Sequence, residues 1–269
     1  MAAMTAFPSG SRAPVLIACS HGTDNVRGRL EIDAVRSGIA ALRPGLEVLE
    51  AYVDVQEPDL VEVVAALPPG RAAVIVPLLL SVGYHVKVDI ARAAASRPGT
   101  VAALPLGPDP RLASVVQQRL LESGVSGHDP VVLAAAGSSD ACAAEDVAEV
   151  LAVLAEGRTG PVRAGFGSKA SPSVPDAVAS YRSDGPGPVA LASYLLAPGY
   201  FHDQLAKAGA DVVSAPLLPD PAIAEIALDR YDDAVTRLLS GVPQPGSACP
   251  RPCRALVPSC VRSAAIQPV

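Results

Sequence analysis

Tryptophan is absent from this chain, and aromatic residues make up only 3% of its 269 residues. Half of the residues are nevertheless hydrophobic, so the core must be built mainly from Ala, Val and Leu, with enough material for one large domain or two modest ones. Positive charge is also scarce, because 21 Lys and Arg stand against 27 Asp and Glu, a formal net charge of -6. This balance gives no general electrostatic reason to bind nucleic acid or an anionic membrane.

Long hydrophobic runs are missing as well. Each apolar run stops at Pro, Gly or a charged residue, short of the roughly 20 residues that a membrane-spanning helix needs. The segment 1–13 lacks a basic start followed by an apolar stretch, so it does not resemble a secretory signal. We therefore expect a cytoplasmic protein that does not bind membranes.

Cysteines are few and unevenly placed. Cys19 and Cys142 lie inside the regular pattern of apolar segments, where a small buried thiol in a reducing compartment is the simplest interpretation. Three more lie in a Pro-rich tail, 241–269, and are Cys249, Cys253 and Cys260. Their spacing matches no common zinc or iron–sulfur pattern, so we expect a disordered tail, with a metal-cluster ligand as the alternative.

Short apolar runs alternate with amphipathic stretches in the first half of the chain. Strands are predicted over 15–19, 46–53, 72–80 and 101–104. Helices are predicted over 27–42, from Pro58 onward, over 86–95, and from Pro110 to 121 with Asp109 as the N-cap. This alternation is typical of a parallel sheet covered by helices.

The same pattern starts again after a linker, 123–129. Four segments match in the same order at a nearly constant offset: 131–138 with 15–22, 161–172 with 46–58, 189–201 with 72–85, and 216–221 with 105–110. We interpret this as an internal duplication. The sequence predicts an α/β fold of two similar lobes, 14–124 and 130–240, each a parallel sheet of about four strands flanked by helices.

Polar side chains follow three predicted strands of the first lobe, and these are His21, Asp54 and His85. In the second lobe their counterparts are Ala136, Ser168 and Phe201. Because the carboxyl ends of parallel strands meet at one edge of a sheet, we expect the three polar groups to face a common cleft. A structural role should survive duplication more often than a chemical one, so the first lobe is predicted to carry the chemistry. For His21 alone, a solvated loop histidine is the alternative.

Two imidazoles and a carboxylate can bind a first-row divalent metal such as Fe²⁺ or Co²⁺ while leaving coordination positions open. The same groups accept protons near neutral pH, so the set fits either a mononuclear metal enzyme or a proton-transfer site. No Gly-rich phosphate loop follows the first strand, and Gly137-Ser138-Ser139 lacks the flanking pattern of a nucleophile elbow. These absences argue against a dinucleotide enzyme and a serine hydrolase.

Four short motifs follow one another in the first lobe: His21-Gly22, Tyr52-Val53-Asp54 ahead of Pro58, Gly83-Tyr84-His85 with Asp89 beyond, and Pro105-Leu106-Gly107-Pro108. In order and spacing they resemble the class II sirohydrochlorin chelatases, in the long, internally duplicated form, over residues 14–237. This family inserts Fe²⁺ in sirohaem biosynthesis or Co²⁺ in cobalamin biosynthesis.

The resemblance implies insertion of a divalent metal, with Fe²⁺ favoured over Co²⁺, into sirohydrochlorin, and loss of two pyrrole protons. It implies that His21, His85 and Asp54 are the catalytic and metal-handling residues, where the family commonly has glutamate in place of Asp54. No permanently bound cofactor is implied, because the metal is a substrate. A monomer is expected, since the two lobes mimic a dimer. A noncatalytic tetrapyrrole or metal carrier that uses the same cleft is the alternative.

Sirohydrochlorin carries eight carboxylates, so an acidic protein needs local positive charge to hold it. Arg27 and Arg29 follow the His21 loop, and Lys87 follows His85. Arginine suits carboxylates through its paired donors. We expect these three cations to contact the substrate, and exposed surface charges are the alternative.

Overall fold

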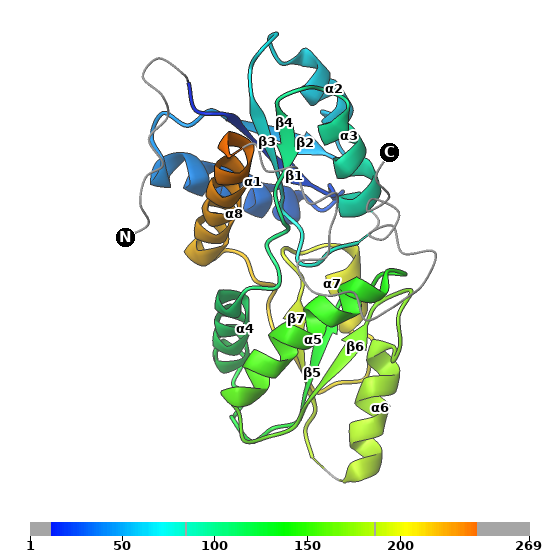
Figure 1. Ribbon diagram of the computed structural model, residues 1–269. Coiled ribbons are helices and arrows are strands. Elements are labelled where there is room, and N and C mark those ends of the chain that lie inside the picture. Colours follow the sequence, from blue (N-terminus) through cyan, green and yellow to red (C-terminus); the bar gives the residue numbers. More distant parts are fainter. Residues whose placement is uncertain (1–11, 84, 186, 241–269) are drawn as a thin grey trace.

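The computed structural model describes residues 12–240, except 84 and 186. For Lys87 it describes the backbone but not the side chain. Its two sheets each contain four parallel strands in the same spatial order (Figure 1). The first sheet, in the order β2-β1-β3-β4, contains β1 (Val15–Ser20), β2 (Val48–Tyr52), β3 (Ala73–Pro77) and β4 (Thr100–Ala102). The second, in the order β6-β5-β7-β8, contains β5 (Val131–Ala135), β6 (Val162–Phe166), β7 (Ala190–Tyr194) and β8 (Val212–Val213). The predicted α/β fold of two similar lobes is therefore confirmed.

Helices flank both sheets. They are α1 (Val26–Leu42), α2 (Leu60–Ala66), the π-helix η1 (His85–Ile90), α3 (Ala91–Ala95), α4 (Pro110–Glu122), α5 (Ala141–Glu156), α6 (Val174–Asp184), α7 (Tyr200–Leu205) and α8 (Pro221–Leu239). Asp109 is the N-cap of α4 as predicted, and its carboxylate accepts a hydrogen bond from the Arg111 N–H. The prediction for Pro58 was wrong, because α2 begins after the N-cap Asp59 and the carbonyl of Pro58 instead accepts from the Tyr52 N–H.

The last helix of each repeat packs on the sheet of the other repeat. Helix α4 packs against α5 and β7, and α8 packs against α1, β3 and β4 (Figure 1). The packed lobes therefore differ from the sequence repeats 14–124 and 130–240, since each sheet is covered by a helix that the other repeat supplies. The tail 241–269, with its three cysteines, lies outside the described residues.

Two arginines, one from each repeat, hold the exchanged helices in place. Arg119 on α4 donates to three backbone carbonyls of 216–219, at 2.6–3.1 Å. Arg230 on α8 donates to three carbonyls of the matching segment 105–108, at 2.9–3.0 Å. Hydrogen bonds with a charged partner contribute about 1.5–3 kcal/mol each, so these contacts tie the two halves together.

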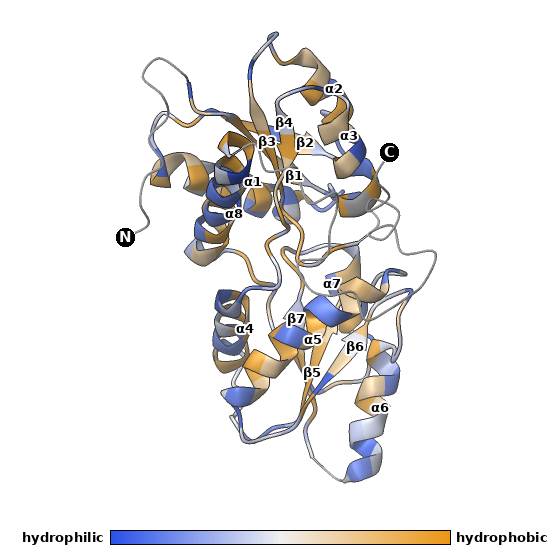
Figure 2. Cartoon of the chain, in the orientation of Figure 1, coloured by the Kyte–Doolittle hydropathy of each residue, from blue (hydrophilic) through white to orange (hydrophobic). Residues whose placement is uncertain are grey.

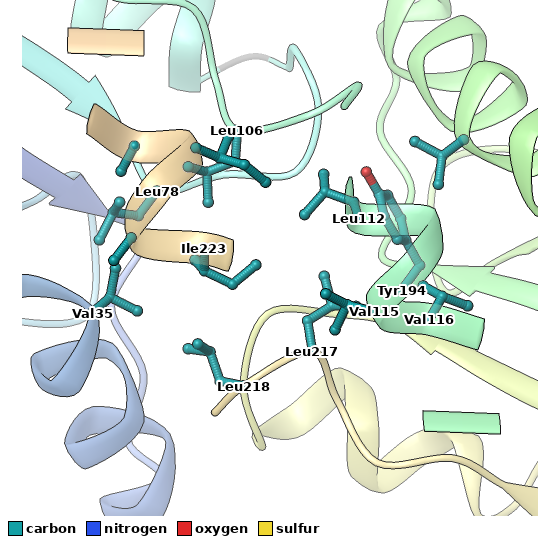
Figure 3. Packing of buried hydrophobic residues seen from close by; sticks show 14 of the residues in the cluster. Val35, Leu78, Leu106, Leu112, Val115, Val116, Tyr194, Leu217, Leu218 and Ile223 are labelled. Atoms are coloured by element: carbon teal, nitrogen blue, oxygen red, sulfur yellow. The ribbon is translucent and has the colours of Figure 1, made fainter. Parts of the chain in front are cut away.

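One apolar cluster runs through both halves of the chain because of this exchange. Leu106, Leu112, Tyr194, Leu217 and Ile223 belong to it, and Figure 3 shows their side chains converging from both repeats. Two smaller clusters fill the other faces of the sheets. Figure 2 shows the strands as mostly hydrophobic, while α4 and α8 carry hydrophilic residues on their outer faces. None of the helices in the described part of the chain is long and apolar enough to span a membrane.

Candidate active site

The loop after β1 presents His21 at the carboxyl edge of the first sheet. Hydrogen bonds from the Val53 and Asp54 N–H groups to the carbonyls of Ser20 and His21, both 3.1 Å, hold it against the loop after β2. Gly22 has a φ of 93°, and a Cβ there would lie 2.4 Å from the Asp54 carbonyl oxygen. The turn therefore needs glycine, for its left-handed backbone and for the close approach of the two loops.

The second lobe keeps this turn without the imidazole. Gly137 has a φ of 85°, and a Cβ there would lie 1.9 Å from the carbonyl oxygen of Ser168. Ala136 stands where the first lobe has His21. The glycine is explained by backbone geometry in both lobes, whereas the histidine of the first lobe is not needed to form the turn.

The structure brings His21 and His85 together. Their ring centroids are 4.8 Å apart and the ring planes are nearly perpendicular, at 86°. His21 is exposed, and the side chain of His85, at the start of η1, is 33% exposed. Both imidazoles are therefore within reach of a ligand at the sheet edge.

A carboxylate that was not predicted as a site residue joins the pair. Asp89 lies one turn after His85, and its Oδ2 is 2.7 Å from Nδ1 of that imidazole. When Nδ1 carries the proton and donates to the carboxylate, Nε2 is the ring atom with the lone pair, and the carboxylate holds the orientation of the ring. The spacing of four residues on a helix was the signal in the sequence.

Asp54 does not join the two imidazoles. Its side chain is exposed, and its Oδ1 accepts from the Val55 N–H at 2.8 Å. Among the residues that the structure describes, no three His, Cys, Asp or Glu side chains form a group that could hold a metal ion. The structure thus pairs the two predicted histidines and places Asp54 on the neighbouring loop.

A buried arginine fixes the strand ends beneath this edge. Arg36 on α1 donates to the Tyr52 hydroxyl at 3.2 Å and to the Ser20 hydroxyl at 3.5 Å, and its guanidinium lies 5.0 Å from the Tyr52 ring centroid. Burial raises the pKa of Tyr52, an effect that Arg36 partly offsets. Burial also raises the pKa of Cys19 to about 12, so this thiol stays protonated near neutral pH. In the sequence, the indication of this contact was an arginine between the apolar positions of α1.

Comparison with protein-family models identifies the family of this chain. Residues 15–123 and 130–234 match the family model CbiX. The chain belongs to the CbiX family. No curated protein sequence matches it.

Solved structures share the fold of this CbiX-family chain. One is SirB from Bacillus subtilis with Fe³⁺, at 22% identity and a TM-score of 0.72 over 84% of this chain and 97% of that one. Another is the sirohydrochlorin chelatase SirB from Bacillus subtilis subspecies spizizenii in complex with cobalt, at 20% identity and 0.69 over 83% and 96%. A third is a CbiX described as the terminal enzyme of sirohaem biosynthesis in denitrifying bacteria, at 21% identity and 0.61 over 82% and 99%. The neighbours therefore have the same two-lobed architecture.

The cations expected near the site of this CbiX-family chain have different surroundings. Arg27 is 73% exposed, and its Nε donates to Glu31 at 2.8 Å. Arg29 donates to the Thr23 carbonyl at 2.7 Å and so braces the His21 loop. Lys87 lies on η1, and its side chain is outside the described part of the structure.

The second lobe borders the site of this CbiX-family chain. The carbonyl of Pro198, in the loop after β7, approaches α1 so closely that a Cβ on Gly28 would lie 2.3 Å from its oxygen. In the position of His85, the second lobe has Phe201, whose ring packs over Gly167. The second lobe therefore replaces the histidine pair with apolar groups and presses its loop against the first helix of the first lobe.

Proposed function

We propose that this CbiX-family chain is a sirohydrochlorin chelatase, a lyase that inserts Fe²⁺, or Co²⁺ as the second candidate, into sirohydrochlorin for sirohaem or cobalamin biosynthesis. The observation that carries the proposal is the pairing of His21 and His85, with ring centroids 4.8 Å apart, at the carboxyl edge of a parallel sheet. The family match and the shared fold with SirB structures that contain Fe³⁺ or cobalt support it.

The imidazoles perform two tasks in this proposal. The metal ion is a substrate, and nitrogen ligands from His21 and His85 replace part of its water shell before the ring nitrogens take over. The ring loses two pyrrole protons for each divalent metal it gains, and an imidazole can accept them near neutral pH. Asp89, whose Oδ2 lies 2.7 Å from Nδ1 of His85, holds the orientation of this ring. Asp54, on the adjoining loop, offers a further oxygen ligand or proton acceptor.

The tetrapyrrole is held between the lobes in this proposal. Its carboxylates are expected to contact Arg27, Arg29 and Lys87, and the second lobe closes over the ring and helps to distort it. No permanently bound cofactor takes part, and the enzyme acts in the cytoplasm as a monomer, without nucleic acid or membrane. A carrier that holds ring or metal in the same cleft without catalysis is the competing function.

Anaerobic metal insertion, followed by the absorbance of sirohydrochlorin, tests this proposal. We expect His21→Ala and His85→Ala each to lower the insertion rate, on the order of 10²-fold or more, because general acid–base catalysis typically contributes that much. His128→Ala is the matched control, since His128 lies in the linker and should leave the rate unchanged. A double variant of the site histidines that inserts Fe²⁺ and Co²⁺ as fast as the unmodified protein would refute the proposal. An unmodified protein that binds the ring but never exceeds the uncatalysed rate would favour the carrier.

A further inference from the structure

We propose that Asp146, a buried carboxylate on α5, is a positioning residue that holds the loop leading to His85. The loop after β3, described over 78–83, leads to η1 and therefore helps to set where the imidazole of His85 stands relative to that of His21. The catalytic consequence of this inference rests on the proposed function, whereas its structural part does not.

Two side chains of the second repeat bind this loop directly. The Val82 N–H donates to Oδ2 of Asp146 at 2.7 Å, and the Tyr194 hydroxyl donates to the Leu80 carbonyl at 3.1 Å. Asp146 is 6% exposed and Tyr194 is 2% exposed. Val82 is three residues before His85, so the contact acts on the histidine through a short stretch of backbone.

The internal duplication provides a built-in comparison. Aligning the two repeats places Glu31 opposite Asp146 and Pro198 opposite Val82. Proline has no N–H, so the loop after β7 cannot donate the matching hydrogen bond. Consistently, Oε2 of Glu31 is buried and has no hydrogen-bond partner among the described residues. The counterpart of Tyr194 is Leu78, which has no hydroxyl.

Both cross-repeat hydrogen bonds thus occur on the loop that leads to His85, and neither can occur on the loop that leads to Phe201. Burying a carboxylate is costly unless its hydrogen bonds are made, so its place on α5 calls for a partner of this kind. Through the buried contact between Val82 and Asp146, the second repeat helps to place His85.

Three variants separate the hydrogen bond from the fold. Asp146→Ala removes the acceptor, Asp146→Asn keeps an oxygen that can accept, and Val82→Pro removes the donor at a position where the other repeat already carries proline. Arg119→Met is the matched control, because it removes cross-repeat hydrogen bonds of a buried cation at residues 216–219, away from this loop.

The first readout is the nuclear Overhauser effect between the ring protons of His21 and His85 in the full chain, with hydrogen exchange of the Val82 amide. We expect a cross-peak between the two histidine rings and a Val82 amide that is protected from exchange in the unmodified protein, in Asp146→Asn and in Arg119→Met. We expect both to weaken in Asp146→Ala, and the cross-peak to weaken in Val82→Pro.

The second readout is Co²⁺ insertion into sirohydrochlorin. Losing a hydrogen bond to a charged group lowers the population of the competent loop, so kcat should fall by about 10- to 100-fold in Asp146→Ala, with little change in the KM for the tetrapyrrole. Asp146→Asn should recover most of the rate, and combining Asp146→Ala with Val82→Pro should cost no more than either change alone.

An unchanged ring-to-ring cross-peak and rate in Asp146→Ala would overturn the positioning role. So would an equal loss in Arg119→Met, because it would trace the effect to general loosening of the repeats. If the unmodified protein inserts no metal, the proposed function fails, while the cross-peak and the amide exchange still decide whether Asp146 positions His85.

Discussion

Replacing Gly28 by Ala should destabilise the protein, although the same change in an ordinary helix is stabilising. Alanine is favoured over glycine inside helices by up to about 1 kcal/mol. At Gly28, however, the added Cβ would lie 2.3 Å from the Pro198 carbonyl oxygen, whereas real Cβ atoms essentially never come within 3.0 Å of another atom. The loop after β7 or helix α1 must therefore move by at least 0.7 Å, the difference between these distances.

The overlap involves backbone rather than the flexible end of a side chain, so relief requires a shift between the lobes. Overpacking of this kind costs about 1–3 kcal/mol, which exceeds the gain in helix propensity. We expect the free energy of unfolding of Gly28→Ala to fall by about 1 kcal/mol or more.

Urea unfolding followed by far-UV circular dichroism measures this change, and the absence of tryptophan makes circular dichroism a better signal than fluorescence. Ser37→Ala is the control, because Ser37 is exposed on the same helix and alanine there should be neutral or slightly stabilising. A Gly28→Ala protein as stable as the unmodified chain would show that the close approach of Pro198 to α1 does not exist in solution.

Three further predictions concern other buried contacts. Burial raises the pKa of Asp109, but hydrogen bonds from Arg111 outweigh this effect and hold the pKa below the ordinary 3.8. The ionised carboxylate therefore stabilises the fold above pH 3.8, and this stabilisation is lost as the pH falls further. In urea unfolding, Asp109→Asn should be less stable than the unmodified protein by about 2 kcal/mol at pH 7, and this difference should narrow below pH 3.8. Gly107→Ala should destabilise more than Gly28→Ala in thermal unfolding, because its Cβ would lie 2.0 Å from the Leu80 carbonyl oxygen in the buried core. Tyr231→Phe should lose about 1–3 kcal/mol in urea unfolding, because the buried hydroxyl donates at 2.7 Å to a carbonyl just before β1 that would lose its partner; no loss would mean that water replaces the hydroxyl.

The strands and the duplication were readable from the sequence because each strand is a compact apolar run followed by a turn residue. The positions of His21 and His85 followed from the rule that parallel strand ends meet at one edge, and the 4.8 Å between their rings agrees with it. Asp54 was expected beside them, but strand order predicts only which loop carries a residue and not the direction of its side chain. Its side chain direction depends on local hydrogen bonds such as that from the Val55 N–H.

The exchange of α4 and α8 was not readable from the sequence. Helical periodicity shows which face of each helix is apolar, and it says nothing about which sheet that face covers. In a duplicated chain the two sheets offer similar surfaces, so the choice depends on the short connections and on contacts such as those of Arg119 and Arg230. The polar groups on these helices pair with carbonyls about a hundred residues away, beyond the range of any local pattern.

The linker 123–129 joins two halves that would otherwise have to find each other as separate molecules. In an assembly of two identical chains, every substitution occurs twice, so a proline that removed the amide of one loop would remove it from both. In the covalently joined chain, each substitution occurs once, and Pro198 can exist beside an intact Val82. In the joined chain the two halves are genetically independent, so that one half can carry the histidine pair while the other carries a carboxylate whose hydrogen-bond partner lies in the first.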